Sequence, residues 1–171
     1  MKTRNLIASL MTLAGLALSL AGCGGGGGSS TQQPATVTPT TAVERLATAG
    51  TLPAGVTIGA IQADVTYPTS GLTIATADVA AAGVAVSGVG TSNTTFQFPN
   101  LNVPGTISIG MLNANGFQAG EFATLTFHLT AGAALPTLSN FAIVPGAVVN
   151  DASTNQPIAS VSVVVQGITL L

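Results

Sequence analysis

The sequence predicts an all-β domain over residues 42–171, a β-sandwich or jelly roll of about eight or nine strands. β-Branched residues are abundant and recur with a period of two, which is the repeat of a strand that buries one face. The alternating stretches are short and are separated by Gly, Pro and Asn turns, a pattern typical of sandwiches. No stretch has the pattern of an amphipathic helix, and only Asp78 to Ala82 could form a single helical turn.

In the first half of the domain the clearest strand runs from Ile61 to Tyr67. Apolar and polar residues alternate along it, so one face is expected in the core and the other in solvent. The turn residues of 68–71 end this strand. The outward set is Gln62, Asp64 and Thr66. Further strands are expected at residues 43–49, 72–74, 83–86 and 94–98.

In the second half the clearest strand covers residues 121–129. Leu125 and Phe127 fall on its core face, and Ile107, Ile109 and Val163 of other strands are expected nearby. The outward set of this strand is Phe122, Thr124, Thr126 and His128. The other strands of this half are expected at residues 106–112, 141–144, 147–149 and 161–165.

The outward set of residues 121–129 is the candidate partner surface of the domain. Phe122, Thr124, Thr126 and His128 combine an apolar ring with small polar neighbours. Protein interfaces are commonly centred on such an aromatic anchor. The alternative is that a loop covers Phe122, or that Phe122 caps the edge of the core.

The start of the chain predicts export. A short basic start precedes an apolar run from Leu6 to Leu20, and the only cysteine follows at position 23. This order is that of a secretory signal peptide. The tetrad Leu20-Ala21-Gly22-Cys23 resembles the lipobox of bacterial lipoproteins, whose cysteine is lipidated and becomes the first mature residue. The resemblance implies that residues 1–22 are removed and that acyl chains on Cys23 anchor the protein to a membrane.

Two alternatives to a lipoprotein exist. The run from Leu6 to Gly22 could be a transmembrane helix, although about 17 residues is the short limit for spanning a bilayer. It could also be a plain secretory peptide with an incidental cysteine. Because Gly24 rather than an aspartate follows Cys23, the lipoprotein resemblance implies the outer membrane of a Gram-negative cell envelope, with the domain facing the periplasm or the cell surface.

Residues 23–41 form the predicted tether that follows the signal peptide. Five glycines at positions 24–28 are followed by Ser, Thr and Pro residues. Gly and Ser give a flexible coil, and Pro34 and Pro39 stiffen the second part. With a membrane anchor at its start, this segment is expected to hold the domain away from the membrane surface.

Charge is scarce in the predicted mature chain. Five acidic residues, Glu44, Asp64, Asp78, Glu121 and Asp151, stand against the single basic residue Arg45, which gives a net charge of 1 − 5 = −4. Binding of nucleic acid, or electrostatic binding to anionic lipid, needs clustered Lys and Arg and is therefore excluded. The lone cysteine also excludes disulfides and thiolate metal sites within the domain.

Several motifs resemble those of cohesin domains. Ile58 to Pro68 resembles the early cohesin strand that ends in a tyrosine and a proline turn, and Gly71 to Ile74 resembles the element that follows it. Pro104 to Ile109 is similar to a "Pro-Gly-x-Ile" strand, and Gly120 to Phe127 to a "Gly-x-Leu-x-x-Ile-x-Phe" strand. The closing segment from Val148 to Val165 is also similar. The resemblance covers about residues 42–166.

The cohesin resemblance implies a nine-strand jelly roll of the fold shared with carbohydrate-binding modules. Well-known cohesins bind dockerin modules, so the resemblance implies a dockerin-like protein partner. This chain is poorer in charge than typical cohesins, and no dockerin-contact residue is carried over.

The residues needed for catalysis are missing. His128 has no partner at metal-ligand spacing, and no Gly-x-Ser-x-Gly elbow is present. Among the acids, Glu44 is expected near the tether and Asp151 in a turn, which argues against a carboxylate pair. We therefore expect no enzyme, no cofactor and no metal, with residues 150–155 as a weak calcium alternative.

The resulting interpretation is a binding or scaffold module held at the cell envelope. The alternative function is a carbohydrate-binding module, which could recognise polysaccharide. Sugar-binding platforms usually need exposed Trp or Tyr, yet the chain has no Trp and Tyr67 is expected inward. An enzyme is the least favoured of the three functions.

Overall fold

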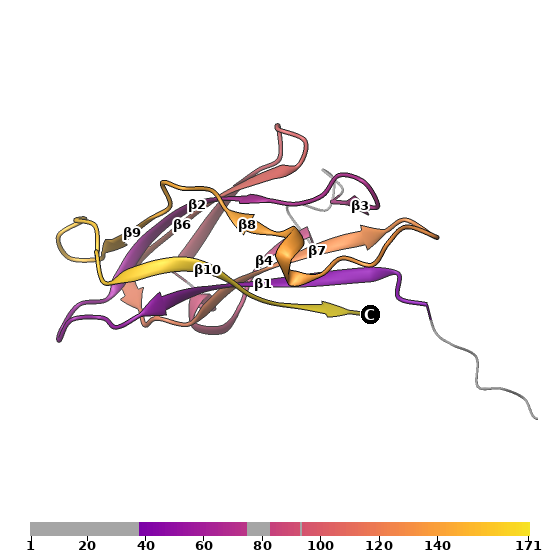
Figure 1. The fold of residues 1–171 in the computed structure, drawn as a ribbon. Helices are drawn as coiled ribbons and strands as arrows, with labels where there is room; N and C mark the ends of the chain where they lie inside the picture. Colours follow the sequence, from indigo (N-terminus) through magenta and orange to yellow (C-terminus); the bar gives the residue numbers. More distant parts are fainter. Residues whose placement is uncertain (1–37, 75–82, 93) are drawn as a thin grey trace, which may run out of the picture. The chain divides into compact units, whose positions relative to one another are not determined.

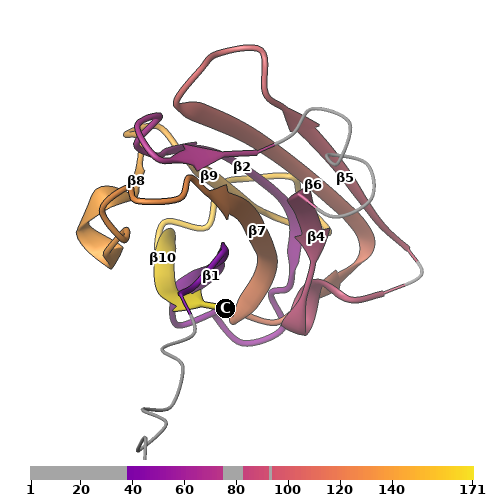
Figure 2. The same cartoon turned by 90° about the vertical axis from the view of Figure 1, so that its right-hand side faces the viewer.

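The computed structural model describes residues 38–74, 83–92 and 94–171, which belong to one compact unit from Val37 to Leu171. Its strands form two antiparallel sheets that face each other across a shared core (Figures 1 and 2). The all-β sandwich is therefore confirmed. The signal peptide, Cys23, nearly all of the tether and the predicted helical turn from Asp78 to Ala82 lie outside the described residues.

Sheet A has the strand order β10-β1-β7-β3, and β4 also pairs with β7. Its two central strands are β1 and β7, and β1 begins one residue before the predicted domain boundary at Ala42. The strands of sheet A are β1 (Thr41–Gly50), β3 (Leu72–Thr73), β4 (Val84–Val86), β7 (Glu121–Leu129) and β10 (Val161–Leu170).

Sheet B has the strand order β5-β6-β2-β8, and β9 also pairs with β2. Its strands are β2 (Ile58–Thr66), β5 (Thr95–Asn100), β6 (Thr106–Phe117), β8 (Ala142–Ile143) and β9 (Val148–Asp151). The described residues thus contain ten strands, slightly more than the expected eight or nine, and β3 and β8 are only two residues long. Short 3-10 turns cover Gly88–Gly90 (η2) and Leu138–Asn140 (η3).

The core between the sheets follows the predicted alternation. On β2 and β6 the inward residues Ile61, Val65, Ile107 and Ile109 are buried. Leu125 and Phe127 of β7 are fully buried from the opposite sheet, as predicted. The ring centroid of Phe127 lies 5.0 Å from that of Tyr67 and 5.6 Å from that of Phe141, so an aromatic cluster joins the two sheets. Burial of β-branched and aromatic side chains on the inner faces of the two sheets stabilises the packing of one sheet on the other.

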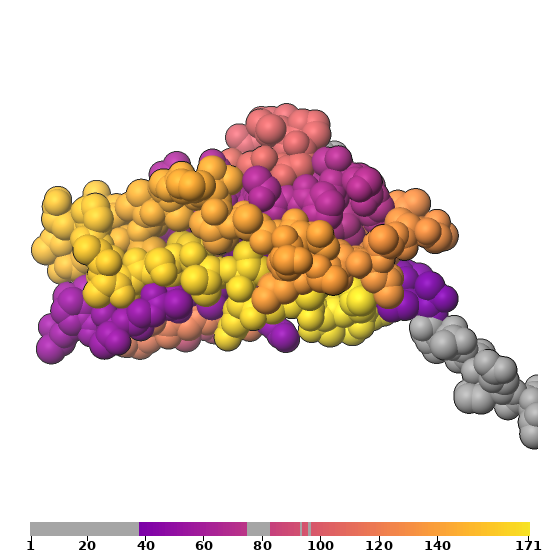
Figure 3. Space-filling view, viewed as in Figure 1, coloured from indigo at the N-terminus to yellow at the C-terminus, as the bar shows by residue number. Residues whose placement is uncertain are grey.

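The side of the molecule seen in Figure 1 is closed by the C-terminal third of the chain. In Figure 3 the orange and yellow residues of β8, β9 and β10 form a continuous surface along this side. β10 pairs with β1 in sheet A, while β8 and β9 pair with β2 in sheet B. The segment from β8 to β10 therefore crosses from one sheet to the other and covers the core between them.

The strand β7 contains an irregularity that the sequence pattern did not predict. Leu46 of β1 lies opposite Ala123, but the next residue, Ala47, lies opposite Glu121, so Phe122 is an extra residue in β7. Such a β-bulge interrupts the alternation of faces. Phe122 and Ala123 are both fully buried as a result. The prediction that Phe122 faces solvent is therefore wrong, and the alternative that Phe122 is covered and belongs to the core is the one observed.

Candidate functional site

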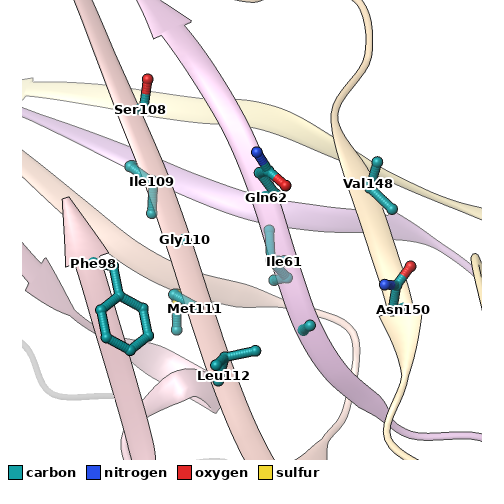
Figure 4. A pocket seen from close by; sticks show the side chains of 11 residues that line it. Ile61, Gln62, Phe98, Ser108, Ile109, Gly110, Met111, Leu112, Val148 and Asn150 are labelled. Carbon is teal, nitrogen blue, oxygen red and sulfur yellow. The ribbon is translucent and has the colours of Figure 1, made fainter. Parts of the chain in front are cut away.

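The outer face of sheet B can be laid out from the register of its strands. A central row crosses the sheet from Phe98 on β5 through Gly110 on β6 and Gln62 on β2 to Val148 on β9. The row on one side of it contains Leu112, Ala60 and Asn150. The row on the other side contains Asn100, Ser108 and Asp64. Figure 4 shows the first two of these rows with the side chains as sticks.

This face has a hollow at its centre. Gly110 has no side chain, while Phe98 on one side and Gln62 on the other stand beside it in the same row. The hollow has a volume of about 370 Å³ and lies over β2, β5, β6 and β9. Phe98 is 58% exposed and Leu112 is 50% exposed, and both side chains lie at this hollow. The hollow is therefore bordered by apolar surface that solvent reaches (Figure 4).

The glycine at position 110 leaves open a space that a side chain could fill. A Cβ atom added there would meet only atoms of Phe98, the nearest at 3.7 Å, which is ordinary van der Waals contact. By contrast, a Cβ at Gly59, on the neighbouring strand β2, would come within 2.4 Å of the Ala152 backbone. The depth of the hollow thus depends on the missing side chain of Gly110 and not on a backbone constraint.

The outer face of sheet A carries most of the predicted partner surface. Thr124 and Thr126 are half-buried there, and His128 is exposed, at the opposite side of the sandwich from the hollow. Beside them Arg45 and Glu121 approach to 4.0 Å between Nε and Oε2. The structure brings Thr124, Thr126 and His128 onto one face as predicted but removes Phe122 from it. This face therefore lacks the apolar anchor on which the prediction rested.

Glu44 lies near the tether, as expected, but its burial was not predicted. Its side chain is fully buried on β1, between the inward residues Ala42 and Leu46. Neither carboxyl oxygen has a hydrogen-bond partner among the described residues. Burial raises the pKa of Glu44 from 4.5 to about 8, because the charged form loses its hydration. Glu44 is therefore protonated at neutral pH and presents no carboxylate to a ligand.

In the loop of residues 150–155, which was the weak calcium alternative, residues of the loop itself donate hydrogen bonds to its carboxylate. Asp151 accepts hydrogen bonds from the backbone N–H of Ser153 at 3.0 Å and from the hydroxyl of Thr154 at 2.8 Å, and Ser153 Oγ also contacts it. These hydrogen bonds lower the pKa of Asp151, and the bond from the Ser153 backbone N–H contributes most. In the part of the chain that the structure describes, no group of three or more His, Cys, Asp or Glu side chains could hold a metal ion.

No helix within residues 38–74, 83–92 and 94–171 is long and apolar enough to cross a membrane.

The hollow on sheet B was not predicted from the sequence, although two signals pointed to it. Phe98 lies in a short strand without a clear polar face, and Gly110 interrupts an otherwise well-formed alternation in β6. An isolated glycine in a strand often marks a close approach of another group.

Comparison with known proteins gives a likeness in fold. No family model matches the sequence, and no curated protein matches it. The sixth cohesin of scaffoldin B from Acetivibrio cellulolyticus, solved in complex with a mutant dockerin, superposes with a TM-score of 0.55 at 19% identity, covering 71% of this chain and 83% of that chain. A cohesin module of a Clostridium perfringens family 33 glycoside hydrolase gives a TM-score of 0.43 at 9% identity, covering 74% and 95% of the two chains. The domain therefore has a cohesin-like fold, as the resemblance implied.

Proposed function

We propose that this chain is a non-catalytic binding module that docks another protein on the outer face of sheet B. The observation that carries the proposal is the hollow at Gly110, bordered by the exposed side chains of Phe98 and Leu112. Interface centres are depleted in charge and enriched in aromatic residues, and this part of the face has both properties. Loss of water from such a patch on docking supplies the main favourable free energy.

The cohesin-like fold supports a dockerin-like module as the class of partner. The cohesin of scaffoldin B was solved in complex with a dockerin. Fold alone does not determine function, so the residues of the face must carry the proposal. A partner that docks here needs an apolar side chain for the hollow, and it must cover the neighbouring rows to reach the ~800 Å² per partner of a stable interface.

A direct test measures binding of the full chain to a panel of purified dockerin modules. We expect at least one module to bind, and Phe98→Ala to weaken that binding by at least about tenfold, as expected for an aromatic anchor. The matched control is Leu138→Ala, which removes an apolar side chain of 44% exposure on η3. Equal effects of the two variants, or no binding by any module, would contradict the proposal.

The carbohydrate-binding alternative can be tested with the same variants. Phe98 is the exposed ring among the aromatic side chains that the structure describes, because Tyr67 is half-buried against Phe127. A sugar platform would therefore have to use Phe98 as well. Binding of polysaccharide that Phe98→Ala abolishes, together with the absence of any dockerin binding, would favour this alternative.

We further propose that Cys23 anchors the module to the cell envelope, in the outer membrane. The lipobox-like Leu20-Ala21-Gly22-Cys23 and the Gly-rich segment after it support this proposal. Two or more acyl chains give stable attachment, whereas one is marginal. Cys23→Ala should abolish metabolic labelling by a fatty acid and leave the chain unprocessed or soluble. Labelling of the variant as strong as that of wild type would contradict anchoring.

A further inference from the structure

The proposed docking face carries a single acidic group close to its hollow. Gln62 lies directly opposite Gly110, and Asp64 is the next residue of β2 that points outward. Two residues along a strand span about 6.7 Å and neighbouring strands are about 4.8 Å apart, so Asp64 lies about 8 Å diagonally from Gly110. Asp64 is half-buried, in the row of Ser108 and Asn100.

No cation of the described residues accompanies this carboxylate. Arg45 is the only basic side chain of the predicted mature sequence, and it lies on the outer face of sheet A, 4.0 Å from Glu121. The groups opposite Asp64 in its row are the hydroxyl of Ser108 and, one strand further, the amide of Asn100. The face thus presents one negative charge beside an apolar hollow, and a complementary surface must bring both an apolar group and a positive charge.

We propose that the partner of this face is a protein segment that places an apolar side chain in the hollow at Gly110 and a Lys or Arg side chain on Asp64. This inference rests on the proposed function and specifies the chemistry of its partner. The apolar group gives affinity by displacing water, and the basic group fixes the orientation of the segment. As water leaves the hollow, the effective dielectric around Asp64 falls and the attraction to the partner's cation strengthens.

The spacing of the two contacts fits a helix. Side chains three or four positions apart on a helix have Cβ atoms about 5–6 Å apart, and a Lys or Arg side chain covers the remaining distance to Asp64. A second copy of this chain fits less well, because the single basic side chain of its predicted mature sequence already faces Glu121 on the outer face of sheet A. The second copy is therefore an outcome that the test must distinguish.

The experiment selects binders to the full chain from a displayed library of two-helix scaffolds with one randomised helix face. We expect the wild-type chain to enrich sequences with a large apolar residue followed or preceded, three or four positions away, by Lys or Arg. Gly110→Val, whose Cβ would meet Phe98 only at ordinary van der Waals distance, should weaken these binders by at least about tenfold. Asp64→Asn should weaken them by about 3–10-fold and reduce the dependence of binding on salt.

A charge exchange then tests the pair itself. Asp64→Lys should abolish binding of a selected helix, and replacing the basic residue of that helix with Glu should restore it. Binders that lose affinity with Gly110→Val but show no basic residue and no response to Asp64→Asn would overturn this inference and leave the proposed function standing. Binders insensitive to Gly110→Val, or no binders at all, would overturn both. A dimer of the chain in sedimentation velocity that Gly110→Val dissociates would assign the face to a second copy instead.

Discussion

The outer faces of the two sheets differ although both belong to the same sandwich. At the centre of sheet A, Thr124 and Thr126 of β7 lie beside Arg45, whose guanidinium is close to Glu121. At the centre of sheet B, Gly110 of β6 lies between Phe98 and Gln62. The centre of the first face is polar, and its charges already have neighbours. The second has exposed apolar groups and a hollow without a side chain.

This contrast shows which outer face leaves apolar surface in contact with water. A β-sandwich needs its inner faces for stability, so the outer faces are free to differ. Threonine side chains and an exposed ion pair interact well with water, and nothing is gained by covering them. Exposed Phe and Leu beside a hollow leave apolar surface in water, which a partner can remove. Sheet B is therefore the face that benefits from docking.

The largest expected difference between the two sheets is in the free energy of unfolding after one phenylalanine of each is replaced by alanine. Phe122 of sheet A is fully buried, whereas Phe98 of sheet B is 58% exposed. We expect Phe122→Ala to lower the free energy of unfolding by ~3–5 kcal/mol, as Phe127→Ala should, because each leaves a cavity. Phe98→Ala should change it by less than ~1 kcal/mol. Chemical denaturation of the full chain measures both, and the reverse order would place Phe122 on the surface of sheet A.

The next largest effect concerns the ionisable group inside sheet A. The pKa of Glu44 is about 8 in the folded chain and 4.5 in the unfolded chain. The unfolded state therefore releases its proton first, and stability falls as pH rises from 4.5 to about 8, then levels off. Glu44→Leu should remove this dependence and raise the free energy of unfolding at pH ~9 by roughly 2–4 kcal/mol.

Denaturation of the wild type and Glu44→Leu at several pH values checks this expectation. A wild-type stability that stays level between pH ~5 and ~8 would show that Glu44 is already ionised in the fold and has found a partner. Phe98→Ala serves as the control from sheet B, because it removes no ionisable group and should leave the difference between the two pH limits unchanged.

The smallest effect concerns the ion pair on the outer face of sheet A. The Arg45 and Glu121 side chains are 44% and 29% exposed and 4.0 Å apart. Such pairs contribute between 0 and about 1 kcal/mol, and salt screens them. Arg45→Gln should therefore lower the free energy of unfolding by less than ~1 kcal/mol, with no difference at high salt. A larger loss that persists in high salt would mean that the Arg45 side chain, whose guanidinium lies over Gly167, stabilises the sheet by packing.

The sequence predicted the sandwich because alternation is a strong signal along β2 and β6, where Ile61, Val65, Ile107 and Ile109 all point inward as expected. The same alternation also indicates that Glu44 is buried, because Ala42, Glu44 and Leu46 share one face of β1. The sequence argument used only the proximity of Glu44 to the tether and not this periodicity. Neighbours in sequence are thus a weaker guide to exposure than the period of the strand.

The candidate site could not be predicted in the same way. Alternation cannot reveal an inserted residue, so the bulge at Phe122 reversed the expected exposure of that side chain. The hollow depends on which residues of β5, β6, β2 and β9 lie opposite one another, and register between distant strands is not visible in a single sequence. Only the pairing of Phe98 with Gly110 shows that a glycine lies beside an exposed ring.

The proposal that the partner docks on sheet B is tested most directly by comparing one substitution on each outer face. Gly110→Val fills the hollow of sheet B, and Thr126→Val changes the centre of sheet A by a side chain of nearly the same shape. Both variants should stay folded, which the unfolding midpoint verifies. For a dockerin module that binds the wild-type chain, we predict a Kd at least about tenfold higher for Gly110→Val and within about twofold of wild type for Thr126→Val. Loss of binding in Thr126→Val with wild-type binding in Gly110→Val would contradict the account and assign the partner to sheet A.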